Sequence, residues 1–334
     1  MSGAPIVTVI TPTKNRRALL AEAVASVVAQ TFCDWEHIIV DDGSDDGTKE
    51  VIERQISCDA RIRFISRECK KAGANVCRNI GLKASKSKYI IFLDSDDSLR
   101  PECLASRVAL MERNLDLDFA VFPAGVFTHS AGDQGTIYHP MKPGDDLLRF
   151  LSHECVWEIS GPIWHRSFLE ILGGFDEDLL STQDLDLHVR ALTAQGRYVF
   201  SSTVDHDIRG HEDDLRTSRQ HFRNPVYISG NSLLRDKLFA EIRQSGLITW
   251  SRKRALLGLG FSACEMWLSC NKPLKAYYTW NYECKKLNAS LLLFIEGSFL
   301  LLMTAMNLPT KRLREKWKCL RRLRPEPVPA DLLT

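Results

Sequence analysis

The sequence predicts an α/β fold in which a mostly parallel sheet carries helices on both faces and is followed by a C-terminal helical extension. Through the first hundred residues, short β-branched runs alternate with helical patterns, which is typical of βαβ units. Beyond Asn224 helical patterns dominate, and no long linker rich in Gly, Pro or Ser precedes them. We therefore expect a catalytic domain over residues 1–223 and a helical region over residues 224–334 that packs against it.

The order of the expected elements places three polar loops at one edge of the sheet. Strands are expected at 6–11, 37–40, 61–65 and 89–93, with helices at 18–29, 48–56 and 74–84. Further strands are expected at 119–122 and 198–200, with helices at 166–172 and 182–195. Ligands of such sheets bind beyond the carboxyl ends of the strands, so the loops after Ile10, Val40 and Leu93 should converge.

Composition indicates an ordinary globular protein. The 334 residues are 44% hydrophobic and 26% charged, and a formal net charge of +2 is too small to indicate nucleic-acid binding. Ten cysteines lie scattered from Cys33 to Cys319 without a CxxC pair, which predicts reduced, mostly buried thiols in a cytoplasmic protein. The N-terminal run Pro5 to Ile10 enters the first motif without the pattern of a secretory signal.

The first two loops have the polar character of a nucleotide site. In the segment Thr11 to Arg16, Pro12 predicts a turn, and polar side chains follow where a base and ribose would bind. A helix-capping turn would look similar. After the second strand, Asp41 and Asp42 offer carboxylates to a base N–H or to ribose hydroxyls. Asp45 and Asp46 are expected to serve the turn itself, with Asp46 capping the next helix.

The third loop is the most informative. An apolar strand ends in Asp94, Asp96 and Asp97, three carboxylates within four residues. Like charges so close repel and resist ionising together. A hard cation such as Mg²⁺ or Mn²⁺ resolves that conflict, because it takes oxygen ligands from one or two carboxylates and from substrate phosphates. The structural alternative is a solvated acidic turn before a helix that starts near Pro101.

Together these segments resemble the family 2 glycosyltransferases, which have a Rossmann-like A-type nucleotide-sugar fold. The resemblance runs from about Pro5 to Arg219. It implies an inverting transfer of a sugar from a nucleotide diphosphate donor to a hydroxyl of a glycan or lipid-linked acceptor. Among such donors the resemblance favours a UDP-sugar. It also implies Mn²⁺ or Mg²⁺ as cofactor and a role in the synthesis of cell-surface polysaccharide or glycolipid.

The resemblance further implies a set of donor and metal contacts. Donor-binding positions are Thr11, Pro12, Asn15, Asp41, Asp42, Arg78, Asn79, Asp94, Ser95 and Arg209. Asp94-Ser95-Asp96 matches the family's DxD element, which makes Asp96 the direct metal ligand, assisted by Asp94. His211 matches a third metal or phosphate contact, although a surface histidine without a partner is the alternative. Gly81, which follows Arg78 and Asn79 in the family's RN-x-G segment, is alternatively a helix-packing glycine.

The downstream segments resemble the acceptor side of the family. Ser160 to Arg166 resembles its acceptor loop, and Gly173 to Asp176 its GGFDE-like turn. Gln183 stands where the family usually has Glu and leaves Asp184 as the expected general base, kept ionised by the dipole of its helix. Asp186 is expected to be structural, paired with the arginine four residues later.

The C-terminal extension predicts contact with a membrane. Residues 289–308 are strongly apolar but include Glu296, which favours a core helix or an interfacial helix over a transmembrane one. Residues 311–324 hold eight Lys or Arg and one Glu, a pattern suited to anionic lipid headgroups or to a solvated surface helix. We expect residues 289–324 to attach the protein peripherally to an anionic membrane surface, at the cytoplasmic face.

Three other functions fit less well. A non-catalytic nucleotide-sugar-binding subunit would not need both Asp96 and Asp184 intact. A glycoside hydrolase would place two carboxylates across a sugar groove and would need no nucleotide loops. A nucleotidyltransferase normally carries a Gly-rich basic loop near its N-terminus, and Thr11 to Arg16 contains no glycine.

Overall fold

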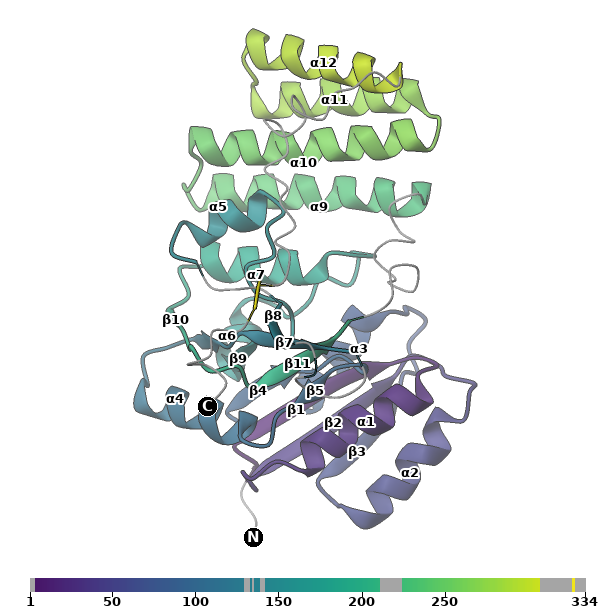
Figure 1. Ribbon diagram of the computed structural model, residues 1–334, viewed down its shortest axis with the longest axis vertical. Helices are drawn as coiled ribbons and strands as arrows, with labels where there is room; N and C mark the ends of the chain where they lie inside the picture. Colours follow the sequence, from purple (N-terminus) through teal and green to yellow (C-terminus); the bar gives the residue numbers. More distant parts are fainter. Residues whose placement is uncertain are drawn as a thin grey trace.

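The computed structural model describes residues 4–128, 133, 135–138, 142–210, 224–306 and 326–327. In Figure 1 the sheets occupy one end of the molecule and a stack of C-terminal helices the other.

The main sheet confirms the predicted, mostly parallel arrangement. Its strands follow the order β10-β6-β9-β4-β1-β2-β3. They are β1 (Val7–Thr13), β2 (Trp35–Asp41), β3 (Ile62–Ser66), β4 (Tyr89–Phe92), β6 (Phe119–Val121), β9 (Pro162–His165) and β10 (Tyr198–Phe200). β9 runs antiparallel to β4 and β6, whereas the other neighbouring pairs are parallel. The loops that follow β1, β2 and β4 therefore leave the same edge of the sheet.

Helices cover both faces of this sheet. They are α1 (Arg17–Val28), α2 (Thr48–Cys58), α3 (Ala74–Ala84), α4 (Cys103–Arg113), α6 (Arg166–Ile171) and α7 (Gln183–Thr193). Neighbouring strand residues point to opposite faces, so Val9 packs in one buried cluster with Leu20 of α1. Ile10 packs in the other, with Leu187 of α7.

A second, smaller sheet was not predicted. Its order is β12-β8-β7-β11-β5, with β5 (Ser98–Leu99), β7 (Ala124–Phe127), β8 (Thr136–Ile137), β11 (His206–Arg209) and β12 (Glu326–Pro327). Strands of two to four residues carry too little alternation to be read from a sequence. β5 begins directly after Asp97, at the end of residues 94–97, which we call the acidic loop, so this loop is joined to the second sheet.

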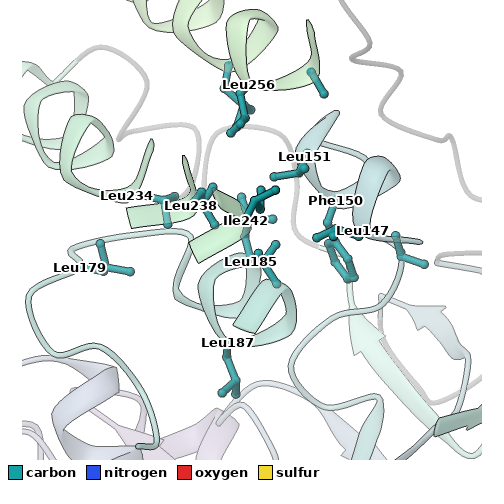
Figure 2. Packing of buried hydrophobic residues seen from close by; sticks show 14 of the residues in the cluster. Leu147, Phe150, Leu151, Leu179, Leu185, Leu187, Leu234, Leu238, Ile242 and Leu256 are labelled. Carbon is teal, nitrogen blue, oxygen red and sulfur yellow. The ribbon is translucent and has the colours of Figure 1, made fainter. Parts of the chain in front are cut away.

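The C-terminal helices pack on the α/β part of the chain, as predicted. They are α9 (Pro225–Gln244), α10 (Trp250–Ser269), α11 (Pro273–Leu287) and α12 (Leu291–Ala305), and a short α5 (Asp146–Leu151) lies beside them. The Asn224 side chain accepts a hydrogen bond from Val226 N and caps α9. Figure 2 shows Leu185 of α7 beside Ile242 of α9 in one buried cluster. A domain boundary at residue 223 stays a prediction, because this core runs across it.

Two local expectations are wrong. Pro12 makes no turn: it is buried inside β1 opposite Val40, and the chain turns at Asn15, whose φ is 51°. The ladder with β4 already ends at Ile10, so the N–H that proline lacks is not needed there. The cysteines are not mostly buried, since four of the nine described thiols are buried, three are exposed and two are intermediate.

The apolar stretch forms α12, which packs on α10 and α11 and agrees with the favoured expectation of a packed or interfacial helix. Within the part of the chain that the structure describes, no helix has the length and apolar character needed to cross a bilayer. The basic segment 311–324 lies outside the described residues.

Candidate active site

The first two loops bind each other at the edge of the sheet. Asn15 N donates to Ser44 Oγ at 2.9 Å, and Asp45 N donates to Asn15 Oδ1 at 2.9 Å. Asp46 accepts from the backbone N of Thr48 at 3.0 Å and so caps α2, as predicted. The predicted convergence of the loops is confirmed.

Asp41 and Asp42 hold this edge in different ways. The Asp41 carboxylate accepts from the backbone N of Ser44 at 3.0 Å and so folds its own loop. The Asp42 carboxylate accepts from Arg67 Nε at 2.5 Å and lies 3.7 Å from Lys14 Nζ. Asp42 thus brings the cations of Arg67 and Lys14 together at this edge. The contacts of both carboxylates with a base or ribose stay predictions.

Thr11 lies beneath this edge. It is buried, and its hydroxyl is 2.9 Å from Nε2 of His37. Burial lowers the pKa of His37 to about 3, so the ring is neutral. The position is that of a residue that supports the nucleotide loop, and direct contact of Thr11 with a donor stays a prediction.

The acidic loop holds its three carboxylates in different states. Arg78 Nη2 lies 2.7 Å from Asp94 Oδ1, and Arg16 Nη1 lies 2.8 Å from Asp96 Oδ2. Asp97 is buried, and its pKa is raised by burial and by the charges of Asp96 and Asp94. Burial is the larger cause, and the charges of Asp96 and Asp94 act in the direction expected from repulsion between neighbouring carboxylates.

Arg209 ties the acidic loop to β11. Its backbone N donates to Asp97 Oδ1 at 3.1 Å, and its Nε donates to the backbone O of Asp96 at 3.1 Å. Its guanidinium also lies over the Phe127 ring, 4.4 Å from the centroid. Ser95 of the same loop is buried. Donor binding by Arg209 and Ser95 stays a prediction, and the contacts show that Arg209 already positions the loop.

Asp184 lies in the first turn of α7, two residues after the N-cap Thr182, which adopts a left-handed φ of 56°. Burial raises its pKa, the Arg78 charge lowers it and the Asp94 charge raises it, with a net upward direction. Loss of solvent therefore outweighs the helix terminus in its effect on the pKa of Asp184, and the expected ionised state of this carboxylate stays a prediction. The same charges show that the predicted base faces the acidic loop.

Arg78, which lies near both Asp94 and Asp184, has two hydrogen-bond donor atoms that no described residue uses. It is 3% exposed, and its guanidinium stacks over Phe175 at 5.2 Å. Within the described residues, its Nε and Nη1 have no hydrogen-bond partner although both are buried. Buried donors are nearly always paired, so a ligand with acceptor oxygens fits there.

The neighbours of Arg78 on α3 fix its position. Asn79 Nδ2 donates to the backbone O of Phe175 at 2.9 Å, and Phe175 N donates back to Asn79 Oδ1 at 2.8 Å. Asn75, the first residue of the segment that resembles the family's RN-x-G element, donates to the backbone O of Leu179 at 3.1 Å. A Cβ on Gly81 would clash with the side chain of Ile10, so this glycine packs the helix on β1. Donor contact by Asn79 stays a prediction, since its amide holds the turn.

Asp186 makes the predicted ion pair. Arg190 Nε and Nη2 lie 2.9 and 2.6 Å from its Oδ2. Arg190 also donates to the backbone O of Leu172 at 2.7 Å, which anchors the turn before α7.

A buried charge cluster behind the acidic loop escaped the sequence analysis. Arg107 pairs with Asp205 through Nε at 2.7 Å and Nη2 at 2.8 Å, and its Nη1 donates to the backbone O of Ser160 at 2.8 Å. His206 lies 2.9 Å from Asp205 and 2.5 Å from Glu158. Burial lowers the pKa of His206, but the two carboxylates outweigh it and raise that pKa. Charged residues on a helix, a loop and a strand give no local pattern that would reveal the cluster.

The carboxylates of the acidic loop have the chemistry that a hard divalent cation requires of its ligands. Carboxylate oxygens of Asp94 and Asp96 are the ligand type that Mg²⁺ and Mn²⁺ take, usually with phosphate oxygens of the substrate. Among the described residues, no group of three or more His, Cys, Asp and Glu side chains is placed to hold a metal ion. The third predicted ligand, His211, lies outside the described residues.

Comparison with known proteins agrees with this geometry. Residues 8–153 match the family model "Glycosyl transferase family 2". The chain is 38% identical over 102 residues to the GalNAc(5)-diNAcBac-PP-undecaprenol beta-1,3-glucosyltransferase of Campylobacter jejuni, covering 30% of this chain and 33% of that protein. It is 34% identical over 110 residues to the UDP-Glc:alpha-D-GlcNAc-diphosphoundecaprenol beta-1,3-glucosyltransferase WfgD of Escherichia coli, covering 33% and 42%. The chain thus matches less than half of either relative's length.

A solved structure extends the likeness of fold to nearly the whole chain. The crystal structure of S. aureus TarS 1-349 in complex with UDP-GlcNAc superposes with a TM-score of 0.63 at 19% identity, covering 94% of this chain and 88% of that one. The predicted A-type fold is thereby confirmed.

Proposed function

Since residues 8–153 carry a family 2 glycosyltransferase domain, we propose that this protein is an inverting glycosyltransferase that moves a sugar from a nucleotide diphosphate donor of the UDP-sugar class to an acceptor hydroxyl. The observation that carries the proposal is the meeting of Asp184, Arg78 and Asp94 at the edge of the sheet. A base, a cation and a metal-binding carboxylate are the groups that such a transfer needs.

Asp184 serves as the general base. It takes the proton of the acceptor hydroxyl as the oxygen attacks the anomeric carbon from the face opposite the nucleotide, which inverts the configuration. Burial raises the pKa of Asp184 and so makes its carboxylate a stronger base than an ordinary aspartate.

Arg78 and the acidic loop serve the leaving group. The unpaired Nε and Nη1 of Arg78 donate to oxygens of the donor's phosphates or sugar. Asp94 and Asp96 would hold Mn²⁺ or Mg²⁺, and the bound cation would supply charge neutralisation to the departing nucleoside diphosphate. The donor site is lined or supported by the remaining predicted residues, which are Thr11, Pro12, Asn15, Asp41, Asp42, Asn79, Ser95 and Arg209.

The acceptor is proposed to be a glycan carried by a lipid. The names of both relatives describe transfer to undecaprenol-linked glycans. Such an acceptor requires the enzyme to work at a membrane surface, and we place the protein peripherally at the cytoplasmic face. The eight cations of residues 311–324 are suited to anionic headgroups there.

A panel of nucleotide sugars tests the transferase. With Mn²⁺ present, one donor should release its nucleoside diphosphate in the presence of acceptor, and that nucleotide should stabilise the fold by about 2.7 kcal/mol at a hundredfold excess over its dissociation constant. Stabilisation without release, across a panel of lipid-linked acceptors, would indicate a non-catalytic binding subunit. No stabilisation by any nucleotide would remove the donor site.

A further inference from the structure

The outermost helix exposes a row of large apolar side chains. They are Leu291, Leu292, Ile295, Phe299, Leu302 and Met306, at 73%, 73%, 55%, 54%, 57% and 53% exposure. We call these six residues the α12 stripe. Figure 1 places α12 at the end of the helical stack farthest from the main sheet. Single exposed apolar residues are common, but six on one helix are not.

The stripe occupies one side of the helix. At about 100° per residue, its six members fall within an arc of roughly 100°. Gly297, Leu300 and Leu301 lie on the opposite side and are buried. Trp280 of α11 donates from Nε1 to Ser298 Oγ at 3.1 Å, which helps to fix how the helix is rotated. The outward orientation of the stripe therefore follows from packing on the inner side.

The segment that follows α12 in the sequence indicates what the α12 stripe contacts. Residues 311–324, which begin five positions after Met306, carry eight Lys or Arg. An apolar helix face joined to a cation cluster matches the boundary of an anionic bilayer, where headgroups meet acyl chains. A protein partner would not require both features in that order along the chain.

The length of α12 decides how it meets the bilayer. Its 15 residues span roughly 22 Å, which is shorter than the hydrocarbon core of about 30 Å. Glu296 borders the stripe and is exposed, so it remains at the water side when the helix lies flat. A helix of this kind inserts one face and does not cross.

We propose that the α12 stripe inserts into the surface of an anionic phospholipid bilayer, with the helix parallel to the membrane plane. This proposal names the surface by which the proposed transferase reaches a lipid-linked acceptor. The physical claim itself needs no transfer activity, so it can fail or hold independently of the proposed function.

A salt wash separates insertion from charge attraction. The full chain is bound to phosphatidylglycerol vesicles and then floated in about 1 M salt, where the Debye length is about 3 Å. The wild-type protein should stay bound. The triple variant Ile295→Gln, Phe299→Gln, Leu302→Gln should retain at least tenfold less protein after the wash, with its thermal unfolding unchanged.

A matched control replaces exposed apolar residues elsewhere. Leu115, Ile171 and Val226 are 75%, 77% and 60% exposed, and their triple glutamine variant should stay bound like the wild type. Brominated lipids should also quench a tryptophan introduced as Ile295→Trp and leave one introduced as Ile171→Trp unaffected. Equal retention of the two triple variants, or release of the wild type by salt, would overturn the proposal.

Two further outcomes identify a different occupant. A wild-type dimer in sedimentation that becomes monomeric in the stripe variant, without binding to vesicles, assigns the stripe to a second copy. Tighter binding to neutral vesicles after truncation behind Met306 assigns it to the chain's own tail. Nucleotide-induced stabilisation, measured without vesicles, should persist in the stripe variant; its absence in the wild-type protein would count against the transferase and not against the stripe.

Discussion

Arg16 Nη1 lies 2.8 Å from Oδ2 of Asp96, so a cation from the first loop pairs with the carboxylate predicted to bind the metal. Arg78 pairs with Asp94 in the same way at 2.7 Å. These arginines offset the repulsion that the acidic loop would otherwise suffer. A metal ion that binds Asp96 must compete with Arg16, and the phosphates of a donor offer this arginine another partner.

Replacing Arg16 should therefore strengthen metal binding in the absence of nucleotide. Arg16→Gln removes the competing cation, and an ion pair at this depth contributes up to about 1 kcal/mol, or roughly fivefold in affinity. Titration with Mn²⁺ followed by electron paramagnetic resonance would measure it. Arg17→Gln, which removes the neighbouring charge without touching Asp96, is the control. Equal metal affinity in both variants would contradict the competition.

Asp184→Asn should abolish transfer and leave donor binding intact. Asparagine keeps the shape but cannot accept the proton, so turnover should fall by at least about a hundredfold while nucleotide-dependent stabilisation survives. Asp96→Ala should lose both turnover and metal-dependent nucleotide affinity. Turnover and calorimetric titration on the same preparations distinguish the two cases.

Asp186→Asn is the control for its neighbour. Its carboxylate binds Arg190 through two contacts, so its loss should act mainly on stability, by about 1 kcal/mol or more. If Asp186→Asn abolished transfer with stability unchanged while Asp184→Asn remained active, the base would be Asp186.

The pH dependence of transfer should carry the raised pKa of Asp184. A general base must be ionised to act, so activity is lost as the pH falls through its pKa. Burial raises the pKa of Asp184 above the value of about 4 that an ordinary aspartate has. Arg78→Gln removes a charge that lowers this pKa and should shift the acidic limb of kcat/KM further upward. An acidic limb at or below pH 4 in the wild-type protein would contradict the raised pKa of Asp184.

Arg107→Met should be strongly destabilising. It leaves the buried Asp205 carboxylate without its partner, which typically costs about 3–5 kcal/mol. Burial raises the pKa of Asp205 but Arg107 outweighs it and keeps that pKa low, so the pair stabilises the fold above pH 4 and less as pH falls. Urea unfolding at neutral and acidic pH would measure the difference. Arg113→Met, at the exposed end of the same helix, should change stability by less than about 0.5 kcal/mol.

The sequence by itself determined the order of the first four strands of the main sheet, the helices between them and the edge where the polar loops meet. It could do so because hydrophobic periodicity is local and because parallel strands present their carboxyl ends on one side. Helix α3 occupies residues Ala74–Ala84, as the pattern predicts, and Asp46 caps α2 as its position suggests.

Only the tertiary structure decided which charges meet. Arg16 and Asp96 are eighty positions apart in the chain, and the cluster of Arg107, Glu158 and His206 joins three separate segments. Desolvation of Asp184 likewise depends on what surrounds it, and it raises the pKa of that carboxyl although the helix terminus favours the charged form. The apolar run at α12 was visible in the sequence, but which of its faces is buried depends on packing against Trp280. Pair contacts and burial are properties of the folded chain, so no local pattern contains them.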